Sequence, residues 1–175
     1  MTIQIDSREK AKAIQKIINY FDARGVQYFT SKLFVGDYQS LDNPRTVIDR
    51  KQNLSELASN ISTVPKKDEY GRIKRDADGY PLTEWKRFTG ELQRAKDAGI
   101  HVIVLCEHGG AITSLDRVPL WNNPRLKKSP LTVDGRELFR KLTLISKMYD
   151  VEFEFCSKAN TGRKIMELLE ANKNG

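Results

Sequence analysis

The sequence is poor in residues that bind transition metals or form disulfides. It contains only 2 cysteines and 2 histidines among 175 residues, and their positions show none of the ligand spacings of a zinc site. Cys106 lies inside an apolar run and Cys156 ends another. We therefore expect two buried, reduced thiols rather than a disulfide.

Long apolar runs are absent as well. No stretch approaches the length needed to cross a bilayer, so we expect no membrane-spanning segment and no membrane partner. Residues Met1–Lys10 are polar and lack the apolar core of a secretion signal, which predicts a cytoplasmic location. No internal repeat or low-complexity tract is evident, and the length fits a single domain over residues 1–175.

Positive charge is in excess. The chain has 30 lysine and arginine residues against 23 aspartates and glutamates, which gives a net charge of +7 and a pI of about 9.4. Cationic side chains that neutralise phosphates release condensed counterions, so this excess favours DNA or RNA as a partner. The charge alone does not select a chemistry.

Apolar periodicity predicts strands and helices in alternation. Strands are expected at 2–6, 26–33, 46–50, 102–105 and 151–155, and helices at 10–24, 54–61, 85–95, 138–148 and 165–169. Asn53 followed by Glu56 has the form of a capping box for the second helix. This order predicts a three-layer α/β domain in which a mixed central sheet is flanked by helices.

One segment, residues 64–82, offers almost nothing to bury, and we expect it to be a mobile basic loop. Its cations lie among several acids, so a solvated excursion and a DNA-contacting surface are both open. A second basic cluster lies near residue 127. The candidate DNA-binding residues are Lys66, Lys67, Arg72, Lys74, Arg87, Lys127 and Lys128.

Two aspartates carry the predicted chemistry. The turn Leu41-Asp42-Asn43-Pro44 returns the chain into a second strand, so a hairpin should bring Asp37 close to Asp49. Alternate residues of a strand share a face, so Asp49 and Lys51 should point together while Arg50 points to the other side. Carboxylates of this kind hold Mg²⁺ or Mn²⁺, with waters and a substrate phosphate completing the coordination, and no organic cofactor is expected. A nearby ammonium could orient the nucleophile or stabilise charge on the phosphate.

An acid, a spacer and a lysine on one strand, preceded by a second acid, form the PD-(D/E)xK nuclease arrangement. Three ordered motifs make the pattern specific: Ile5-Asp6-Ser7-Arg8-Glu9, Val35-Gly36-Asp37-Tyr38 and Asp49-Arg50-Lys51. With them the chain resembles the ERCC4-type (XPF/Mus81-like) nuclease domain. The resemblance implies a restriction-endonuclease-like core and a metal-dependent DNA endonuclease. It also implies catalytic roles for Asp37, Asp49, Lys51, Asp6, Arg8, Glu9 and Arg50, with Asp37 and Asp49 as the metal ligands.

The chain departs from the family pattern at two points. Asp49 replaces the family's glutamate, and Ser55, with Glu56 beside it, stands where the family usually has another aspartate. No helix-hairpin-helix or helicase region is evident, so the chain resembles small, stand-alone phage or prophage forms of the domain. A role in DNA repair or recombination and a homodimer, formed through helix 138–148 or the last helix, are what the resemblance implies.

Structural alternatives remain for several residues. Asp37 could be the acceptor of a tight turn, Asp49 and Lys51 a local ion pair, and Asp6 a bridge from a strand end to its neighbour. Arg50 could steer phosphate or pair with an acid on the opposite face. Trp85 and Phe88 are expected in the core, whereas Trp121 could be core or a base-stacking platform.

Three functions are therefore compared. The first is a Mg²⁺- or Mn²⁺-dependent endonuclease acting on flaps, forks or junctions. The second is a catalytically silent DNA-binding or scaffolding module that pairs with an active subunit. The third is a restriction-type nuclease that cuts plain duplex at one sequence. The presence of Asp37, Asp49 and Lys51 favours an active enzyme over the silent module.

Overall fold

The computed structural model describes residues 1–129 and 132–171. A mixed six-stranded sheet with the strand order β2-β1-β3-β4-β5-β6 forms its centre. The strands are β1 (Thr2–Asp6), β2 (Gln27–Ser31), β3 (Tyr38–Ser40), β4 (Asn43–Lys51), β5 (His101–Glu107) and β6 (Val151–Cys156). The helices are α1 (Ala11–Ala23), α2 (Leu54–Asn60), α3 (Glu84–Asp97), α4 (Gly135–Tyr149) and α5 (Thr161–Ala171), with two 3₁₀ helices, η1 (Leu115–Leu120) and η2 (Pro124–Lys127).

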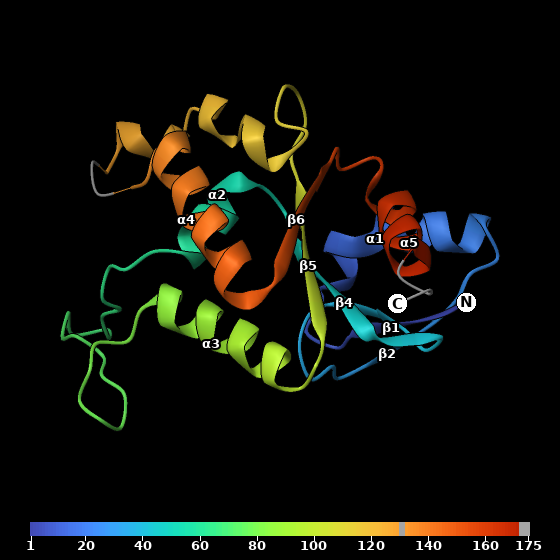
Figure 1. Ribbon diagram of the computed structural model, residues 1–175, viewed down its shortest axis with the longest axis horizontal. Coiled ribbons are helices and arrows are strands. Elements are labelled where there is room, and N and C mark those ends of the chain that lie inside the picture. The colour runs from blue at the N-terminus through green and yellow to red at the C-terminus, as the bar shows by residue number, and fades with distance from the viewer. Residues whose placement is uncertain (130–131, 172–175) are drawn as a thin grey trace.

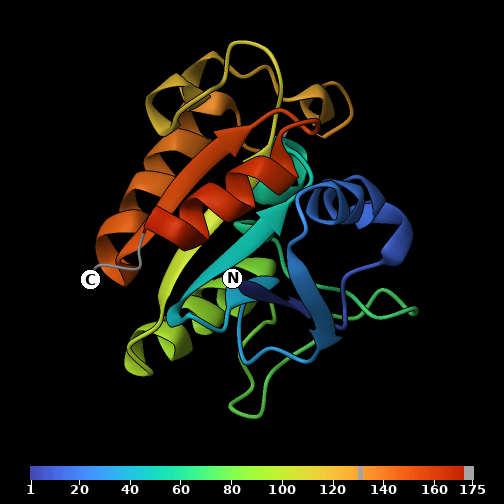
Figure 2. The same cartoon turned by 90° about the vertical axis from the view of Figure 1, so that its right-hand side faces the viewer.

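Helices cover both faces of the sheet. The helices α1 and α5 lie side by side on one face, and α2, α3 and α4 lie on the other, as Figures 1 and 2 show. Each face has its own hydrophobic core, one centred on Ile48 and Ile103 and the other on Val47 and Val104. Neighbouring strand residues point to opposite faces, so these four side chains divide between the two cores. The predicted three-layer α/β architecture is confirmed.

Strand pairing brings the N-terminal motif and the hairpin into one half of the sheet. β1 pairs parallel with β2 and antiparallel with β3, and β3 pairs antiparallel with β4. β4, β5 and β6 are parallel to one another, as the apolar β5 sequence predicts. The parallel strands end at the same edge of the sheet, and Asp49 and Lys51 of β4 lie there.

Local signals in the sequence account for the start of α2 and for the large core residues. The Asn53 side chain accepts a hydrogen bond from the backbone N–H of Glu56 at 2.9 Å, as the capping motif predicts. Phe88 is fully buried, and Trp85 packs against the same core. Trp121 is also buried, so of its two alternatives, core residue or base-stacking platform, the structure shows a core residue.

No helix within residues 1–129 and 132–171 is both long and apolar enough to span a bilayer. In the same part of the chain both cysteines are free thiols, Cys106 buried and Cys156 half-buried. Burial raises the pKa of the Cys106 thiol to about 12, so this thiol stays protonated at neutral pH.

Candidate active site

The two predicted metal ligands lie side by side. Asp37 directly precedes β3, and its backbone N–H donates to the carbonyl of Ile48 on β4 at 2.8 Å. Its side chain accepts a hydrogen bond from the backbone N–H of Arg50 at 2.7 Å, which holds the carboxylate next to Asp49. The donor lies on the neighbouring strand β4, so this hydrogen bond differs from that of the tight turn that was the alternative for Asp37.

Gly36 allows this close approach. It has φ +74°, and a Cβ atom placed on it would lie 3.1 Å from the carbonyl oxygen of Ile48 and 3.2 Å from the Val47 Cβ. A side chain at this position would be strained in conformation and also pushed against β4. The glycine therefore lets β3 begin within hydrogen-bonding distance of β4, with Asp37 facing the end of that strand.

Asp49 and Lys51 share one face of β4, as the strand period predicts. The Lys51 ammonium lies 2.7 Å from Asp49 Oδ1 and 5.3 Å from the centre of the Phe88 ring. Burial opposes the charge of Lys51, but the neighbouring Asp49 carboxylate outweighs it and raises the pKa of the lysine. The Asp49 carboxylate therefore favours the ammonium form of Lys51.

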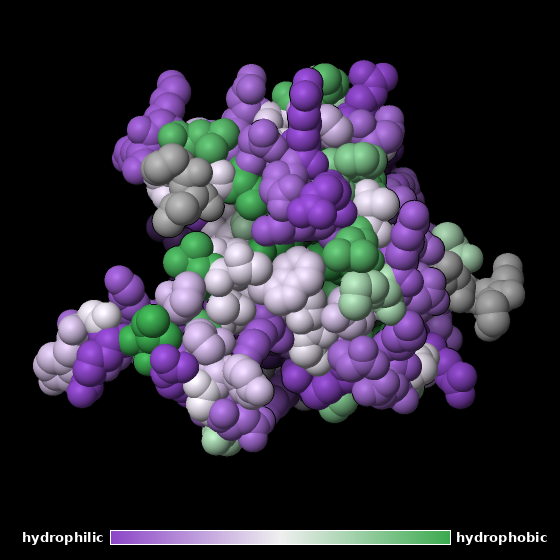
Figure 3. Space-filling model, turned by 60° about the vertical axis from the view of Figure 1, so that its left-hand side comes forward, coloured by the Kyte–Doolittle hydropathy of each residue, from purple (hydrophilic) through white to green (hydrophobic). Residues whose placement is uncertain are grey.

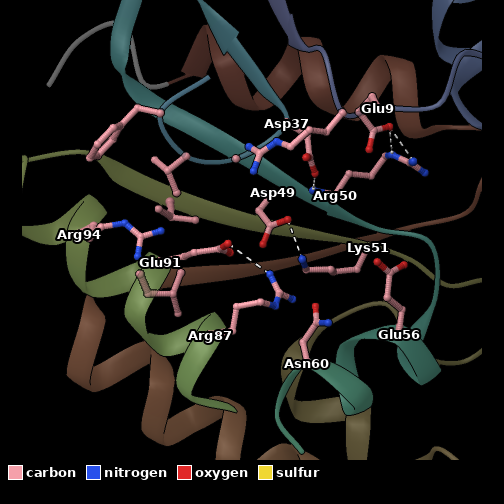
Figure 4. Close-up of a pocket in the computed structure, with 16 residues that line it drawn as sticks. Glu9, Asp37, Asp49, Arg50, Lys51, Glu56, Asn60, Arg87, Glu91 and Arg94 are labelled. Atoms are coloured by element: carbon pink, nitrogen blue, oxygen red, sulfur yellow. Dashed lines mark hydrogen bonds and ion pairs between the residues drawn. The ribbon is translucent and has the colours of Figure 1, made fainter. Parts of the chain in front are cut away.

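These residues line a pocket of about 260 Å³ at the end of β4 (Figure 4). One wall comes from the segment before β3, a second from α2 and a third from α3. The charged and amide side chains of the lining are Arg8, Glu9, Asp37, Asp49, Arg50, Lys51, Glu56, Asn60, Arg87, Glu91 and Arg94. A phosphodiester would thus meet cations on several sides of a carboxylate pair.

The pocket has the electrostatics of a cation site. Burial, followed by the charges of Asp49 and Glu9, raises the pKa of Asp37 well above its ordinary value. A carboxylate whose pKa is raised by burial and by a neighbouring carboxylate is stabilised by a divalent cation bound beside it, and oxygen donors suit Mg²⁺ and Mn²⁺. Asp37 and Asp49 therefore fit the predicted metal, although no cluster of three or more acidic, histidine or cysteine ligands occurs within the described residues.

Arg50 points away from Asp49 and Lys51 into the other side of the sheet. Its guanidinium donates to Glu9 at 2.7 Å and to Glu107 at 3.2 Å, and it is almost fully buried. Burial opposes its charge, but Glu9, Tyr38 and Glu107 outweigh burial and raise its pKa. Of its two predicted roles, the geometry matches pairing with acids on the opposite face.

The N-terminal motif divides into a buried and an exposed part. Asp6 is fully buried and accepts hydrogen bonds from the backbone N–H groups of Leu33 (2.7 Å) and Arg8 (2.8 Å) and from the Arg8 side chain (2.6 Å). It does not line the pocket, and its contacts are those of a bridge between β1 and the segment after β2. Arg8 and Glu9 do reach the pocket.

Several lining residues were not singled out by the sequence analysis. Glu56, rather than Ser55, reaches the pocket, because its place on α2 directs it toward Lys51 (Figure 4). Asn60 follows one helical turn later and has a buried amide oxygen without a hydrogen-bond partner. The spacing of four residues between Glu56 and Asn60 is the signal that could have predicted their common face. Arg94 has no carboxylate partner among the residues described.

The predicted DNA-binding residues fall into three places. Arg87 lines the pocket, where it pairs with Glu84 (2.8 Å) and Glu91 (3.2 Å). Lys127 and Lys128 are exposed at the end of η2 and do not line the pocket. The remaining four, Lys66, Lys67, Arg72 and Lys74, lie on the segment that joins α2 to α3.

This segment, residues 64–82, is here called the arm, and it contains two copies of one hairpin. Residues 67–74 and 75–82 repeat the same turn, in which the backbone N–H of an aspartate donates to the carbonyl four residues later, at 2.9 Å in both copies. Each copy ends its turn on a left-handed glycine, Gly71 (φ +79°) and Gly79 (φ +82°). In sequence the two copies share only an aspartate and a glycine, so the repeated turn has no clear signal in the sequence.

A mixed sheet between two helical layers, with paired acids and a lysine at the strand ends, defines a restriction-endonuclease-like α/β domain. The chain belongs to the ERCC4 domain family, whose model matches residues 5–166. The resemblance carried by the three motifs is thus confirmed. A comparison with curated proteins gives no match.

Two solved structures are similar to this chain. One is XPF from Aeropyrum pernix, with 17% identity, a TM-score of 0.63 and coverage of 99% of this chain and 66% of that one. The other is XPF from Aeropyrum pernix in complex with DNA, with 17% identity, a TM-score of 0.60 and coverage of 97% and 64%. At this identity the likeness establishes the fold. The chain spans slightly less than two thirds of the length of these proteins.

Proposed function

We propose that this chain is a Mg²⁺- or Mn²⁺-dependent endodeoxyribonuclease that cuts branched or partly single-stranded DNA such as flaps, forks or junctions. The observation that carries the proposal is the half-buried Asp37–Asp49 pair, which meets Lys51 in one pocket. The net charge of +7 suits a polyanionic substrate. XPF from Aeropyrum pernix, which shares the fold, has been solved with DNA.

The roles of the side chains follow from their positions. Asp37 and Asp49 would hold the cation, which when bound supplies a water of lowered pKa and neutralises charge on the phosphate. Lys51, as an ammonium, would stabilise negative charge that develops on the phosphate oxygens. Arg87 and Arg94, on the α3 wall, would bind the DNA backbone and orient the scissile bond.

The biological setting is part of the same proposal. Family resemblance favours DNA repair or recombination, and a phage or prophage source, as the context of cleavage. A homodimer would use the exposed Leu144 and Met148 on α4 or a surface of α5, and the molar mass in solution would test it.

A panel of labelled DNAs tests the activity directly. Single strand, plain duplex, flap, fork and Holliday junction are incubated with Mg²⁺ and the wild-type chain. We expect nicks in the branched forms and a loss of at least about a hundredfold in Asp49→Asn and Lys51→Ala, because the first weakens the metal site and the second removes a cation that acts on the reacting phosphate. Both variants should keep the wild-type melting curve.

Two neighbouring variants serve as a matched pair in this assay. Glu56→Gln removes a charge from the pocket and should slow cleavage, whereas Ser55→Ala, one residue earlier, should leave the rate unchanged. Wild-type protein that leaves every DNA form intact would contradict the proposal. Cleavage of plain duplex at one sequence would replace it with a restriction-type nuclease.

A catalytically silent DNA-binding module is the second candidate. One observation favours it: the described residues contain no cluster of three or more potential metal ligands. The Lys51–Asp49 ion pair also competes with metal for one oxygen of Asp49. DNA binding without cleavage, in the presence of Mg²⁺ or Mn²⁺, would select this candidate.

A further inference from the structure

The most exposed large hydrophobic side chains are aromatic. They belong to a residue that lines the pocket and to the segment that joins two helices of its wall. Among the residues described, the three highest exposures belong to Tyr70 (74%), Phe34 (64%) and Tyr80 (63%). Phe34 lines the pocket itself, and the two tyrosines lie on the arm. Exposed aromatic rings are costly in water unless they have a partner, so their concentration here indicates a binding surface.

The arm is attached to the two helices that form the pocket walls. It leaves the end of α2, which contributes Asn60 to the pocket, and returns to the start of α3, which contributes Arg87. It projects from the body of the molecule as two fingers (Figures 1 and 2), and in Figure 3 it forms the lobe at the lower left. DNA that enters the pocket from this side would pass along the arm.

Hydrogen bonds hold the two tyrosines in place. In the first hairpin the carboxylate of Asp68 accepts from the backbone N–H groups of Tyr70 and Arg72, both at 2.9 Å. In the second, Asp76 accepts from the backbone N–H of Tyr80 at 2.8 Å. Rings on a fixed backbone lose little conformational entropy when they bind a flat partner.

The same hydrogen bonds occupy two of the negatively charged side chains of the arm. Asp68 and Asp76 are used as internal acceptors, and their side chains also pair with Arg72 (2.8 Å) and Lys86 (3.4 Å). Within the described residues Lys67, Lys74 and Arg75 form no ion pair, and neither do the two other acids of the arm, Glu69 and Asp78. A cation lies against each tyrosine ring as well, Arg72 at 5.1 Å from Tyr70 and Lys86 at 4.8 Å from Tyr80.

Exposed aromatic rings interleaved with cations are the features that bind single-stranded nucleic acid. Each unpaired base can stack on a ring, and the cations follow the phosphates. Bases in a duplex are already stacked on each other and do not offer their faces. The surface therefore distinguishes an unpaired strand from a paired one without reading its sequence.

We propose that Phe34, Tyr70 and Tyr80 form a base-stacking surface that holds an unpaired DNA strand next to the cleavage pocket. Tyr70 and Tyr80 bind the strand on the arm, and Phe34 stacks a base at the rim of the pocket. This inference rests on the proposed function, since it needs a DNA substrate. Stacking of unpaired bases on these rings would explain why the enzyme prefers branched DNA to plain duplex.

The test measures DNA binding by the whole chain with Asp49→Asn, so that bound DNA stays uncut. Dissociation constants are determined by fluorescence anisotropy for one sequence as single strand, as duplex, and as duplex with a single-stranded flap. Phe34→Ala and the double variant Tyr70→Ala/Tyr80→Ala are compared with Phe29→Ala, which removes an exposed ring from the edge strand β2. A 2-aminopurine base in the flap reports stacking through its fluorescence.

We expect each removed ring to weaken binding of the single strand and the flap at least about fivefold and to leave duplex binding within twofold. Phe29→Ala should have no effect. The dependence on salt should stay unchanged, because stacking releases no counterions. Tyr70→Phe and Tyr80→Phe, which keep the rings, should bind as the parent does and should quench 2-aminopurine equally.

Other outcomes overturn the inference in distinguishable ways. If the parent protein binds DNA and the ring variants bind every DNA form equally well, the stacking surface is refuted. The nuclease proposal then stays intact. Equal losses for duplex and single strand would do the same. A parent that binds none of the DNAs contradicts both proposals, and an altered molar mass with unaltered DNA affinity would make the arm a protein interface.

Discussion

Asp6 is a buried acid whose hydrogen bonds make it structural. Burial opposes its ionisation, but the hydrogen bonds from Arg8 and from the backbone of Leu33 outweigh burial and lower its pKa. We expect Asp6→Asn to reduce the free energy of unfolding at neutral pH by about 1–3 kcal/mol, because an amide group would face the Leu33 N–H donor. Urea denaturation measures the change.

The pH dependence of this difference has a definite sign. A carboxyl with a lowered pKa in the folded state contributes stability above its unfolded value of 3.8, and the contribution is lost as the pH falls through the folded pKa. The gap between wild type and Asp6→Asn should therefore shrink in acid. Asp78→Asn, at an exposed site, is the control. A gap that is absent at neutral pH would contradict this reading.

Residue roles could be predicted from the sequence where a local pattern decides them. The two-residue period of a strand places Asp49 beside Lys51 and sends Arg50 away, as observed. The role of Arg50 itself depends on Glu107, more than fifty positions away in the chain, and no local pattern predicts that pairing. The capping motif and the spacing place Glu56 and Asn60 on one face of α2, but no local pattern shows that this face borders the pocket.

At the scale of elements, the start of β3 depends on Gly36. We expect Gly36→Ala to lower the free energy of unfolding by more than about 1 kcal/mol, because the new methyl group combines a positive φ with contacts on Val47 and Ile48. Gly25→Ala is a matched control, since Gly25 has φ +63° and open space around it. Chemical denaturation of both variants measures the difference.

Divalent-cation binding distinguishes a local displacement of Asp37 in Gly36→Ala from a general loss of stability. The methyl group would displace Asp37 from β4, so divalent-cation binding should weaken in Gly36→Ala and remain unchanged in Gly25→Ala. Equal stability and equal cation binding in the two variants would show that close packing at Gly36 does not position the acid.

Elements with a repeated apolar pattern were predictable, whereas the arm was not. Helices such as α3 and strands such as β5 follow from periodicity, because burial of one face or of both decides their structure. The arm buries little, so its hairpins depend on aspartate side chains and left-handed glycines rather than on hydrophobicity. The prediction that it moves freely stays a prediction.

At the scale of the molecule, a buried network joins the active strand to its surroundings. Arg50 connects β4 with Glu9 before α1 and with Glu107 at the end of β5, and Glu107 accepts a hydrogen bond from Thr161 at the start of α5 at 2.9 Å. The pocket side of β4 carries Asp49 and Lys51, and Arg50 on the opposite side fixes the strand. The order of elements predicted the layers, but this link between them needed the three-dimensional structure.

The central claim is that Asp37 and Asp49 together bind a divalent cation. Titration of Mn²⁺ into the whole chain, with free Mn²⁺ followed by electron paramagnetic resonance, tests it most directly. Wild-type protein should deplete the free-ion signal, and Asp37→Asn and Asp49→Asn should each bind at least about tenfold more weakly, while Asp78→Asn should bind as wild type does. Wild-type protein that leaves the signal unchanged, or variants that bind equally well, would contradict it.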